Sequence, residues 1–373
     1  MSKTAESMAL LKDGSVVVSL RSQGASVALF CLVATAFLVV PVRNFGADQS
    51  AGTRLDTYFR RLNYEGMNFR LDKDNQPLLD GEVGGQKCAL LMDSGWGMTT
   101  LKGSAAKGLK TLDELGVVLE DSVLGPLTNS SLVLVEKLVL GRAQFLNQPA
   151  KVEKLKADFI RLRFDGILGC DFFLRNHCLI DCGAQRIYFR SAKPSEQQSD
   201  ALTQTLRRSG FIEIAIKLDD GLNIDARLNG QPVRLLVDTG SSLSLLDEAE
   251  AKRFSLNSIR HDQPELGTYI REDINVRIVG MGSIGAHQGW VATLRSLQIG
   301  SREWKDIHFG VTNLRAWGIE QLASAGQKVQ GFLGMHLLMG EGALIDFASG
   351  KLWLRPDKPP QNAKTIAEKA PGH

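Results

Sequence analysis

Short apolar runs, alternating or continuous, recur along most of the chain, and turn residues separate them. FIEIAIKL (211–218) and LNIDARL (222–228) alternate between apolar and polar positions, and VRLLV (233–237) is nearly continuous. Asp-Gly and Asn-Gly pairs lie between these runs. Alternation with a period of two predicts half-buried β-strands, and such pairs are typical of hairpin turns. The pattern predicts a mainly β protein, with short helices around 103–115 and 247–254.

One apolar segment near the N-terminus does not fit this pattern. From Ser22 to Val42 no residue is charged, and Arg21 and Arg43 flank the segment. About 20 such residues can span a bilayer as a helix. A cleaved signal peptide is the alternative, but its charged region would be unusually long and no clean cleavage site follows Val42. We expect an N-terminal tail (1–21) and an uncleaved transmembrane anchor (22–42).

The anchor carries an expectation about location. The residues beyond it would lie outside the cytoplasm, in the periplasm or at the cell surface, and cleavage of the segment would make the protein secreted. The flanking charges give a weak inside-positive bias in this direction.

The sequence contains an internal duplication. GQKCALLMDSG (85–95) aligns with GQPVRLLVDTG (230–240) at an offset of 145 residues, and 166–190 aligns with 331–355 at an offset of 165. Two blocks in the same order indicate two copies of one unit rather than a solenoid, which needs several short repeats. Identical residues in the second pair of blocks are Gly166/Gly331, Leu168/Leu333, Gly169/Gly334, Ile180/Ile345, Asp181/Asp346 and Arg190/Arg355.

The duplication defines the expected organisation of the chain. The two copies occupy 64–190 and 210–356. The stretch 191–209 is polar, contains Pro and Ser, and is predicted to be the linker between them. The tail 357–373 is polar and rich in proline, and we expect it to be disordered.

In each copy an aspartate ends an apolar run and begins a tight turn: Asp93 in LLMDSG and Asp238 in LLVDTG. A carboxylate is seldom buried without partners, because desolvation disfavours its charge. One such aspartate could simply hydrogen-bond its own turn. Its repetition at one offset favours a functional pair of acids.

The paired motif resembles the aspartic peptidases. An apolar run into Asp-Ser/Thr-Gly is followed much later by two apolar residues and Gly, at ILG (167–169) and FLG (332–334), and the ending LIDFASGKLWL (344–354) is most similar to the bacterial retropepsin-like group. The resemblance covers both copies. It implies two tandem retropepsin-like β-barrel lobes in one chain, forming a pepsin-like pseudo-dimer after one transmembrane helix.

The resemblance also implies the chemistry. Asp93 and Asp238 would face each other and share a proton, so that one activates a water as base while the other protonates the peptide carbonyl. The Ser94 and Thr239 hydroxyls would pin each acid loop to its counterpart. The other residues implied to support these loops are Gly95, Gly240 and Ser241, with Ile167, Leu168, Phe332 and Leu333 packed behind them.

Members of this family also carry a glycine-rich flap over the substrate. In the second copy the candidate is VGMGSIGAHQG (279–289), and in the first it is SVLGPLTNSS (122–131). A plain hairpin tip is the alternative for both. The flap candidates are Gly280, Met281, Gly282, Ser283, Gly125 and Pro126.

GMGSIG (280–285) also fits the G-x-G-x-x-G fingerprint of dinucleotide-binding proteins. That fingerprint requires a helix opening at the third glycine and a surrounding βαβ unit. The residues after it alternate like a strand and include Gly289. We therefore expect no dinucleotide cofactor.

Composition excludes several further classes. The net charge of +3 and the absence of Lys/Arg runs argue against a nucleic-acid partner. The six histidines are scattered, so we expect no zinc or other metal. Five cysteines are too few for a disulfide scaffold. One pair including Cys88 could form in an oxidising compartment, although buried free thiols are favoured for Cys88, Cys170, Cys178 and Cys182.

The expected function is that of a membrane-anchored aspartic endopeptidase on peptide or protein substrates, a monomeric pseudo-dimer with a homodimer as the alternative. Trp96 departs from the family pattern, because Ser241 occupies the matching place in the second copy. Its indole could crowd the first acid. A catalytically inactive membrane-anchored peptide-binding or scaffolding protein on the same fold is therefore the alternative function.

Overall fold

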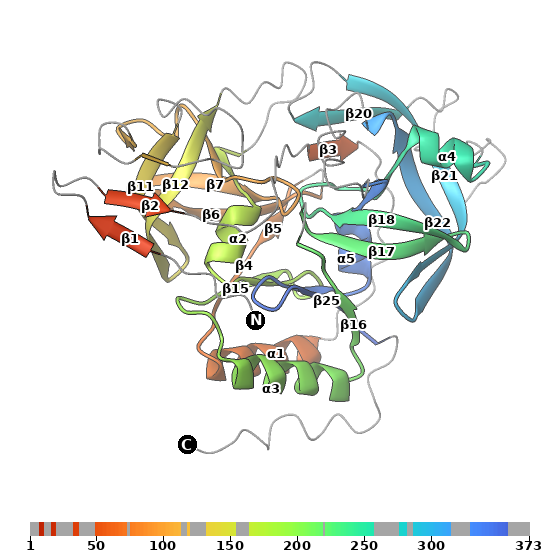
Figure 1. Cartoon of the computed structure of the whole chain (residues 1–373), viewed down its shortest axis with the longest axis horizontal. Coiled ribbons are helices and arrows are strands. Elements are labelled where there is room, and N and C mark those ends of the chain that lie inside the picture. Colours follow the sequence, from red (N-terminus) through yellow and green to blue (C-terminus); the bar gives the residue numbers. More distant parts are fainter. Residues whose placement is uncertain are drawn as a thin grey trace.

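The computed structural model describes residues 7–10, 16–19, 33–36, 49–72, 75–112, 118–119, 132–153, 164–218, 221–256, 276–281, 286–314 and 329–356. These residues form two β lobes that lie side by side above a shared sheet, with two helices beneath that sheet (Figure 1). The predictions of a mainly β chain and of two barrel lobes are confirmed.

The first lobe is a closed barrel. Its strands are hydrogen-bonded in the order β6-β7-β13-β8-β12-β11, and β11 pairs back to β6. Gly84 and Gly85 both have positive φ (55° and 82°), which suits the two-residue turn joining β6 to β7. The strands are β6 (Pro77–Val83), β7 (Gln86–Met92), β8 (Thr100–Lys102), β11 (Leu132–Leu140), β12 (Ala143–Glu153) and β13 (Gly166–Leu168), with β5 (Arg70–Leu71) and β9 (Lys110–Thr111) at its margins.

The second lobe repeats this topology. Its strands follow the order β17-β18-β23-β19-β22-β21, and β21 pairs back to β17. Beyond β21 the sheet continues with β20 and β3. The strands are β17 (Asn223–Leu228), β18 (Gln231–Val237), β19 (Leu245–Asp247), β20 (Val276–Met281), β21 (Ala286–Ile299), β22 (Arg302–Thr312) and β23 (Gly331–Leu333).

A six-stranded sheet joins the two copies. Its order is β16-β25-β24-β14-β15-β4, and the central pair, β14 and β24, is antiparallel with Ile180 opposite Ile345. The two LID sequences of the duplication thus meet at its centre. The strands are β4 (Glu65–Asn68), β14 (Leu179–Asp181), β15 (Arg186–Phe189), β16 (Ile212–Ala215), β24 (Leu344–Asp346) and β25 (Lys351–Leu354).

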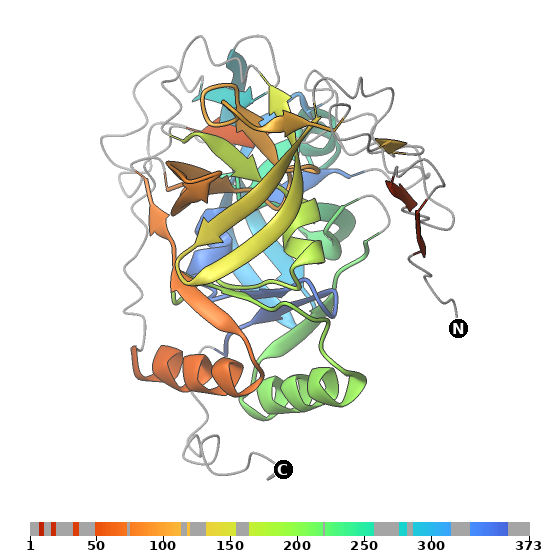
Figure 2. The same ribbon diagram turned by 90° about the vertical axis from the view of Figure 1, so that its left-hand side faces the viewer.

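Helices α1 (Gln49–Arg61) and α3 (Glu196–Arg208) lie next to each other and cover the face of this sheet that points away from the barrels (Figures 1 and 2). Phe59 and Leu206 are both fully buried there, in one cluster with Tyr188 and Trp353. The polar stretch 191–209, predicted to be a linker, is therefore mostly helix α3. Its sequence supports this, since Ser195 and Gln198 form a capping box at its start.

The duplication extends to these two helices. After α1, the amide of Tyr64 donates to Phe59 O at 3.0 Å, and after α3 the amide of Phe211 donates to Leu206 O at 3.0 Å. The preceding residues, Asn63 and Gly210, both adopt positive φ. Each repeated unit is therefore a helix followed by a barrel lobe.

Three short helices lie within the lobes. They are α2 (Cys170–Arg175), α4 (Glu248–Arg253) and α5 (Met335–Gly340). Helix α4 confirms the prediction for 247–254. The prediction for 103–115 is wrong over 103–112, where turns and β9 occur instead, because Gly103 and Gly108 interrupt the helical pattern.

In the part of the chain that the structure describes, none of the helices has the length and apolar character that spanning a bilayer requires. Most of the predicted anchor, 22–42, lies outside the described residues. Within it, Val33–Ala36 form strand β3, which pairs antiparallel with β20, where a helix was predicted. The edge of β20 that does not pair with β21 offers backbone hydrogen-bond partners to this segment. Val33 and Thr35 are β-branched, which favours a strand locally.

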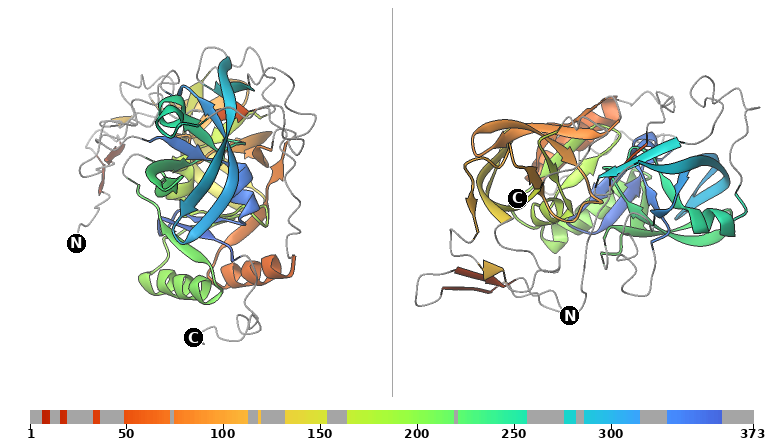
Figure 3. Two further views of the ribbon diagram at one scale, coloured as in Figure 1. Left: turned by 90° about the vertical axis from the view of Figure 1, so that its right-hand side faces the viewer. Right: turned by 90° about the horizontal axis from the view of Figure 1, so that it is seen from above.

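A small separate sheet completes the described structure. Strands β1 (Ser7–Leu10) and β2 (Val16–Ser19) pair antiparallel, β10 (Val118–Leu119) joins β2 in parallel, and the sheet lies to one side of the first lobe (Figure 3). Cys88, Cys170, Cys178 and Cys182 are buried and carry no disulfide among the described residues. The remaining predicted segments, 1–21 beyond β1 and β2 and the tail 357–373, lie outside the described residues.

Candidate active site

The two candidate acids sit at equivalent strand ends. Strand β7 ends just before Asp93 and strand β18 just before Asp238, and each acid's backbone amide donates to the neighbouring strand, Asp93 to Leu168 O and Asp238 to Leu333 O, both at 3.0 Å. Strands β13 and β23, which precede Gly169 and Gly334, therefore lie beside strands β7 and β18 and hydrogen-bond to the two acids.

Each acid is held by its own turn. Oδ1 of Asp93 accepts from the amides of Gly95 and Trp96, both at 3.0 Å. Oδ1 of Asp238 accepts from Gly240 at 2.9 Å and Ser241 at 3.0 Å. Two fixed bonds to one oxygen set the orientation of each carboxyl group.

Crossed hydroxyl bonds join the two acid loops. The Ser94 hydroxyl donates to Val237 O at 2.8 Å and accepts from the Thr239 amide at 3.0 Å. In the reverse direction, the Thr239 hydroxyl donates to Met92 O at 2.9 Å and accepts from the Ser94 amide at 2.9 Å. All four bonds are buried and each crosses from one lobe to the other.

The same loops bring the carboxyl groups together. A methyl group on Gly95 would lie 2.6 Å from Cγ of Asp238, and one on Gly240 would lie 2.3 Å from Cγ of Asp93. Only glycine leaves room for the opposite acid at these two positions. The close approach of each glycine to the opposite carboxyl means that the two acids face each other across the lobe boundary. Asp93 and Asp238 are both fully buried and so shielded from solvent.

Burial and proximity change the protonation of this pair. The pKa of Asp93 is raised well above its usual value, first by desolvation and then by the charge of Asp238. Desolvation also raises the pKa of Asp238, to about 6, while its interaction with Asp93 and its turn amides oppose the rise. Oδ2 of each acid is buried and accepts no bond from other described residues. The pair is therefore arranged to hold one proton between two carboxyl groups.

Trp96 does not displace the first acid. Its amide makes the same bond to Asp93 that the amide of Ser241 makes to Asp238. Its indole turns away, donates to the Thr100 hydroxyl at 2.9 Å and packs on a small apolar cluster that includes Ile167. The first acid loop keeps its geometry despite the large side chain.

The first residues of helices α2 and α5 hold the loops that follow the two acids, and sequence reasoning missed this contact. The Cys170 amide donates to Trp96 O at 2.6 Å, and the Met335 amide donates to Ser241 O at 2.7 Å. Asp171 and His336, the next residues, bind the same two loops through their side chains. The aligned blocks contained this signal, because these two residues occupy matching positions.

Part of the second predicted flap, 279–289, lies among the described residues, and none of the first, 122–131, does. Strands β20 and β21 form an antiparallel hairpin with Val279 opposite Ala286, and Gly280 and Met281 lie on β20. Gly282 and Ser283 lie outside the described residues, as do Gly125 and Pro126. Ala286 begins a strand, so the helix required by the dinucleotide fingerprint does not form.

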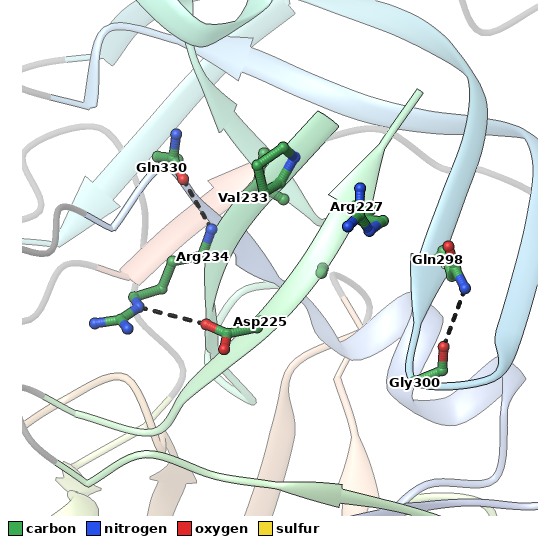
Figure 4. A pocket seen from close by; sticks show the side chains of 9 residues that line it. Asp225, Arg227, Val233, Arg234, Gln298, Gly300 and Gln330 are labelled. Carbon is green, nitrogen blue, oxygen red and sulfur yellow. Dashed lines mark hydrogen bonds and ion pairs between the residues drawn. The ribbon is translucent and has the colours of Figure 1, made fainter. Parts of the chain in front are cut away.

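The described residues contain no cluster of His, Cys, Asp or Glu suited to a metal ion. A cavity of about 530 Å³ lies elsewhere, on the second lobe, between β17, β18 and the end of β21 (Figure 4). Arg234, Asp225 and Gln330 line it and bond to one another. Neither Asp93 nor Asp238 lines this cavity, so it is separate from the acid pair.

Comparison with known proteins agrees with this geometry. Residues 224–337 match the family model described as aspartyl protease, a span that contains Asp238 and its supporting strands. Over this span the second lobe is similar to the aspartyl protease family. The resemblance of the chain to retropepsin-like aspartic peptidases is thereby confirmed.

Two solved structures are similar to the chain. The aspartic proteinase from Irpex lacteus shares 13% identity over 78% of this chain and 97% of its own, with a TM-score of 0.42. A retropepsin-like aspartic protease from Rickettsia conorii shares 25% identity over 39% of this chain and 89% of its own, with a TM-score of 0.24. No curated protein matches the chain.

The crossed hydroxyl bonds predict the effect of Thr239→Val. The variant keeps the shape of the side chain but leaves Met92 O and the Ser94 amide without their buried partner, so we expect it to lose about 2–4 kcal/mol of unfolding free energy. Thr239→Ser, which keeps the hydroxyl, is the matched control and should lose less than about 1.5 kcal/mol. Urea unfolding of the three proteins measures both values, and equal losses would contradict the assigned role of the hydroxyl.

The raised pKa values predict a pH-dependent cost of the acid pair. The folded state binds these protons more tightly than the unfolded chain does. Proton binding by the pair therefore contributes fully to the unfolding free energy below pH 3.8, and this contribution is lost as the pH rises through about 6, the folded pKa of Asp238. We therefore expect Asp238→Asn, which cannot ionise, to unfold at a higher temperature than the wild type at about pH 8, with a smaller difference near pH 4. A wild type that is the more stable protein throughout this range would contradict the arrangement.

Proposed function

We propose that this aspartyl peptidase is an endopeptidase in which Asp93 and Asp238, one from each lobe, hydrolyse peptide bonds through a water held between them. The observation that carries the proposal is the pair of fully buried carboxyl groups, fixed face to face by four hydroxyl bonds between the lobes. The family match of the second lobe supports the reaction class.

The two carboxyl groups have different roles in the proposed reaction. Desolvation raises the pKa of both carboxyl groups, so the pair holds one proton, and one carboxyl is protonated while the other is ionised. The ionised carboxyl takes a proton from the water as the water oxygen attacks the peptide carbonyl carbon, and the protonated carboxyl gives its proton to the carbonyl oxygen. Because the acids are coupled, the pair titrates jointly in any measured pH profile.

Collapse of the resulting tetrahedral intermediate completes the cleavage. The C–N bond breaks as the carboxyl that took the water proton gives it to the leaving nitrogen, one hydroxyl of the intermediate returns its proton to the other carboxyl, and a new carboxyl group and a new amine are released. The acid pair returns to its singly protonated state. Overall one water is consumed, its hydroxyl group ends on the new carboxyl group and its other hydrogen on the new amine, and the acid pair is regenerated.

Digestion of a mixed peptide library tests this function. We expect the protein to cut the library, and Asp93→Asn or Asp238→Asn to lower the rate by at least about a thousandfold, because each variant removes one proton-transfer partner. Trp96→Ser, which copies the second lobe, serves as a matched control that keeps the acid turn. If the wild type and both aspartate variants bind peptides equally and cut none, the protein is a binding or scaffolding module on this fold.

Mixing the two aspartate variants separates a site within one chain from a site between chains. A pseudo-dimer predicts that the mixture stays inactive, since each chain lacks one acid. Recovered cleavage would instead mean that two copies exchange lobes to form the site.

We propose as well that residues 22–42 anchor the protein in a membrane, with both lobes outside the cytoplasm, which requires that Val33–Ala36 leave their pairing with β20. The support is the uncharged apolar sequence between Arg21 and Arg43. Alkaline carbonate washing of membranes should leave the full chain in the pellet and release a chain lacking 22–42. Release of the full chain, or a mature N-terminus beyond residue 42, would overturn the anchor.

A further inference from the structure

The loops that follow the two acids are tied down in the same way in both lobes. In the first, the Gly169 amide donates to the Thr99 hydroxyl at 3.3 Å, and the Thr99 amide donates to Asp171 Oδ1 at 2.7 Å. In the second, the Gly334 amide donates to the Ser244 hydroxyl at 2.9 Å, and the Ser244 amide donates to a side chain at 3.1 Å. That side chain is His336, which stands where the first lobe has Asp171.

The two acceptors, the Asp171 carboxyl and the His336 imidazole, differ in whether they can still accept a hydrogen bond after protonation. A carboxyl group keeps an acceptor oxygen whether it is ionised or protonated, so Asp171 can hold Thr99 in both states. An imidazole accepts through Nδ1 only while that nitrogen carries no proton. The bond from Ser244 therefore fixes the tautomer of His336, with its hydrogen on Nε2.

We propose that unprotonated His336 is a positioning residue of the active site, holding through Ser244 the loop that carries Asp238, and that this dependence exists in the second lobe alone. The inference rests on the proposed function for its catalytic consequence. Its structural part stands on the Ser244 bond itself.

The surroundings of His336 link this bond to Asp238. The segment from Asp238 to Ser244 is bound to 333–336 by four further bonds, which come from the amides of Asp238, Met335, His336 and Gly334. A methyl group on Gly334 would lie 2.2 Å from Leu243 O, so the two segments are in close contact. A shift of Ser244 is therefore passed along a short, tightly packed loop to the acid.

The environment favours the unprotonated imidazole. Burial lowers the pKa of His336 to about 4, and the charge of His308 on β22 acts in the same direction. His308 itself bonds to the Thr293 hydroxyl on β21. Helix α5 and the loop 241–244 carry no other titratable group, and Asp247 on β19 is engaged by the amides of Ala249 and Leu314.

Two substitutions test the positioning role. His336→Leu removes the acceptor, and we expect kcat on a cleaved peptide to fall about 10- to 100-fold with little change in KM. His336→Asn supplies an amide oxygen in place of Nδ1, and we expect it to recover most of that loss. A His336→Leu protein that is folded and has the kcat of the wild type would overturn the proposal, as would an Asn variant no better than Leu.

The pH dependence of unfolding gives a second readout that does not need activity. Since the folded pKa of His336 is depressed to about 4 from 6.5, the unfolded chain binds the extra proton between these values, and stability falls as the pH is lowered through that window. The wild type should therefore lose stability relative to His336→Asn as the pH falls from about 6.5 to 4. Comparing the two proteins cancels the opposite contribution of the aspartate pair, which both contain.

His177→Asn is the matched control for this series. His177 lies after α2 in the first lobe with φ of 46°, a conformation that asparagine tolerates. It should leave kcat unchanged, and because desolvation and the charges of Lys193 and Arg190 also lower the pKa of His177, it should give a pH-dependent difference in unfolding of the same sign but smaller than that of His336→Asn. A pH-dependent difference that is identical in His177→Asn and His336→Asn, or absent in His336→Asn, would refute the role of His336.

The two readouts separate this proposal from the proposed function. If the wild type cuts no peptide at any pH, the endopeptidase assignment fails, and the unfolding series still tests whether His336 is unprotonated in the folded protein, as its bond from Ser244 requires. If the wild type is active and the unfolding series shows no effect of His336, the endopeptidase stands and the positioning role fails.

Discussion

The structure depends on the exchange of hydroxyl bonds between Ser94 and Thr239. Each hydroxyl donates to a backbone carbonyl of the opposite loop and accepts from a backbone amide there. Neither loop therefore has its buried polar groups satisfied without the other lobe. A buried network of this kind rigidifies its surroundings only when every member is satisfied. These bonds hold the two acid loops, and with them Asp93 and Asp238, next to each other across the lobe boundary.

The shared frame permits differences between the lobes. Trp96 and Ser241 give the same amide bond to their acids, while their side chains go to unrelated partners. Asp171 and His336 likewise serve one purpose with different chemistry. After duplication, the backbone bonds of the acid loops were retained and the side chains around them diverged. The two equivalent acid loops therefore have different side-chain surroundings.

The sequence predicted the parts of this arrangement that are local and repeated. The acid turns and the strands leading to them follow from apolar runs, Asp-Ser/Thr-Gly and an offset that recurs. The polar composition of 191–209 concealed α3, although the spacing of Leu202 and Leu206 and the capping box at Ser195 indicate a helix. The pairing of β14 with β24 could not be predicted in the same way, because that register joins residues far apart in the chain.

The acid pair and its frame also have opposite energetic roles. Desolvation raises the pKa of both carboxyl groups, so keeping one of them ionised near neutral pH costs folding free energy. The turn amides at Oδ1 recover part of that cost, and they do so at one oxygen only, which leaves Oδ2 of each acid without a partner among the described residues. An arrangement optimised for stability would satisfy both oxygens or bury apolar groups instead. The turn amides thus leave one oxygen of each acid free to share the proton, as the proposed reaction requires.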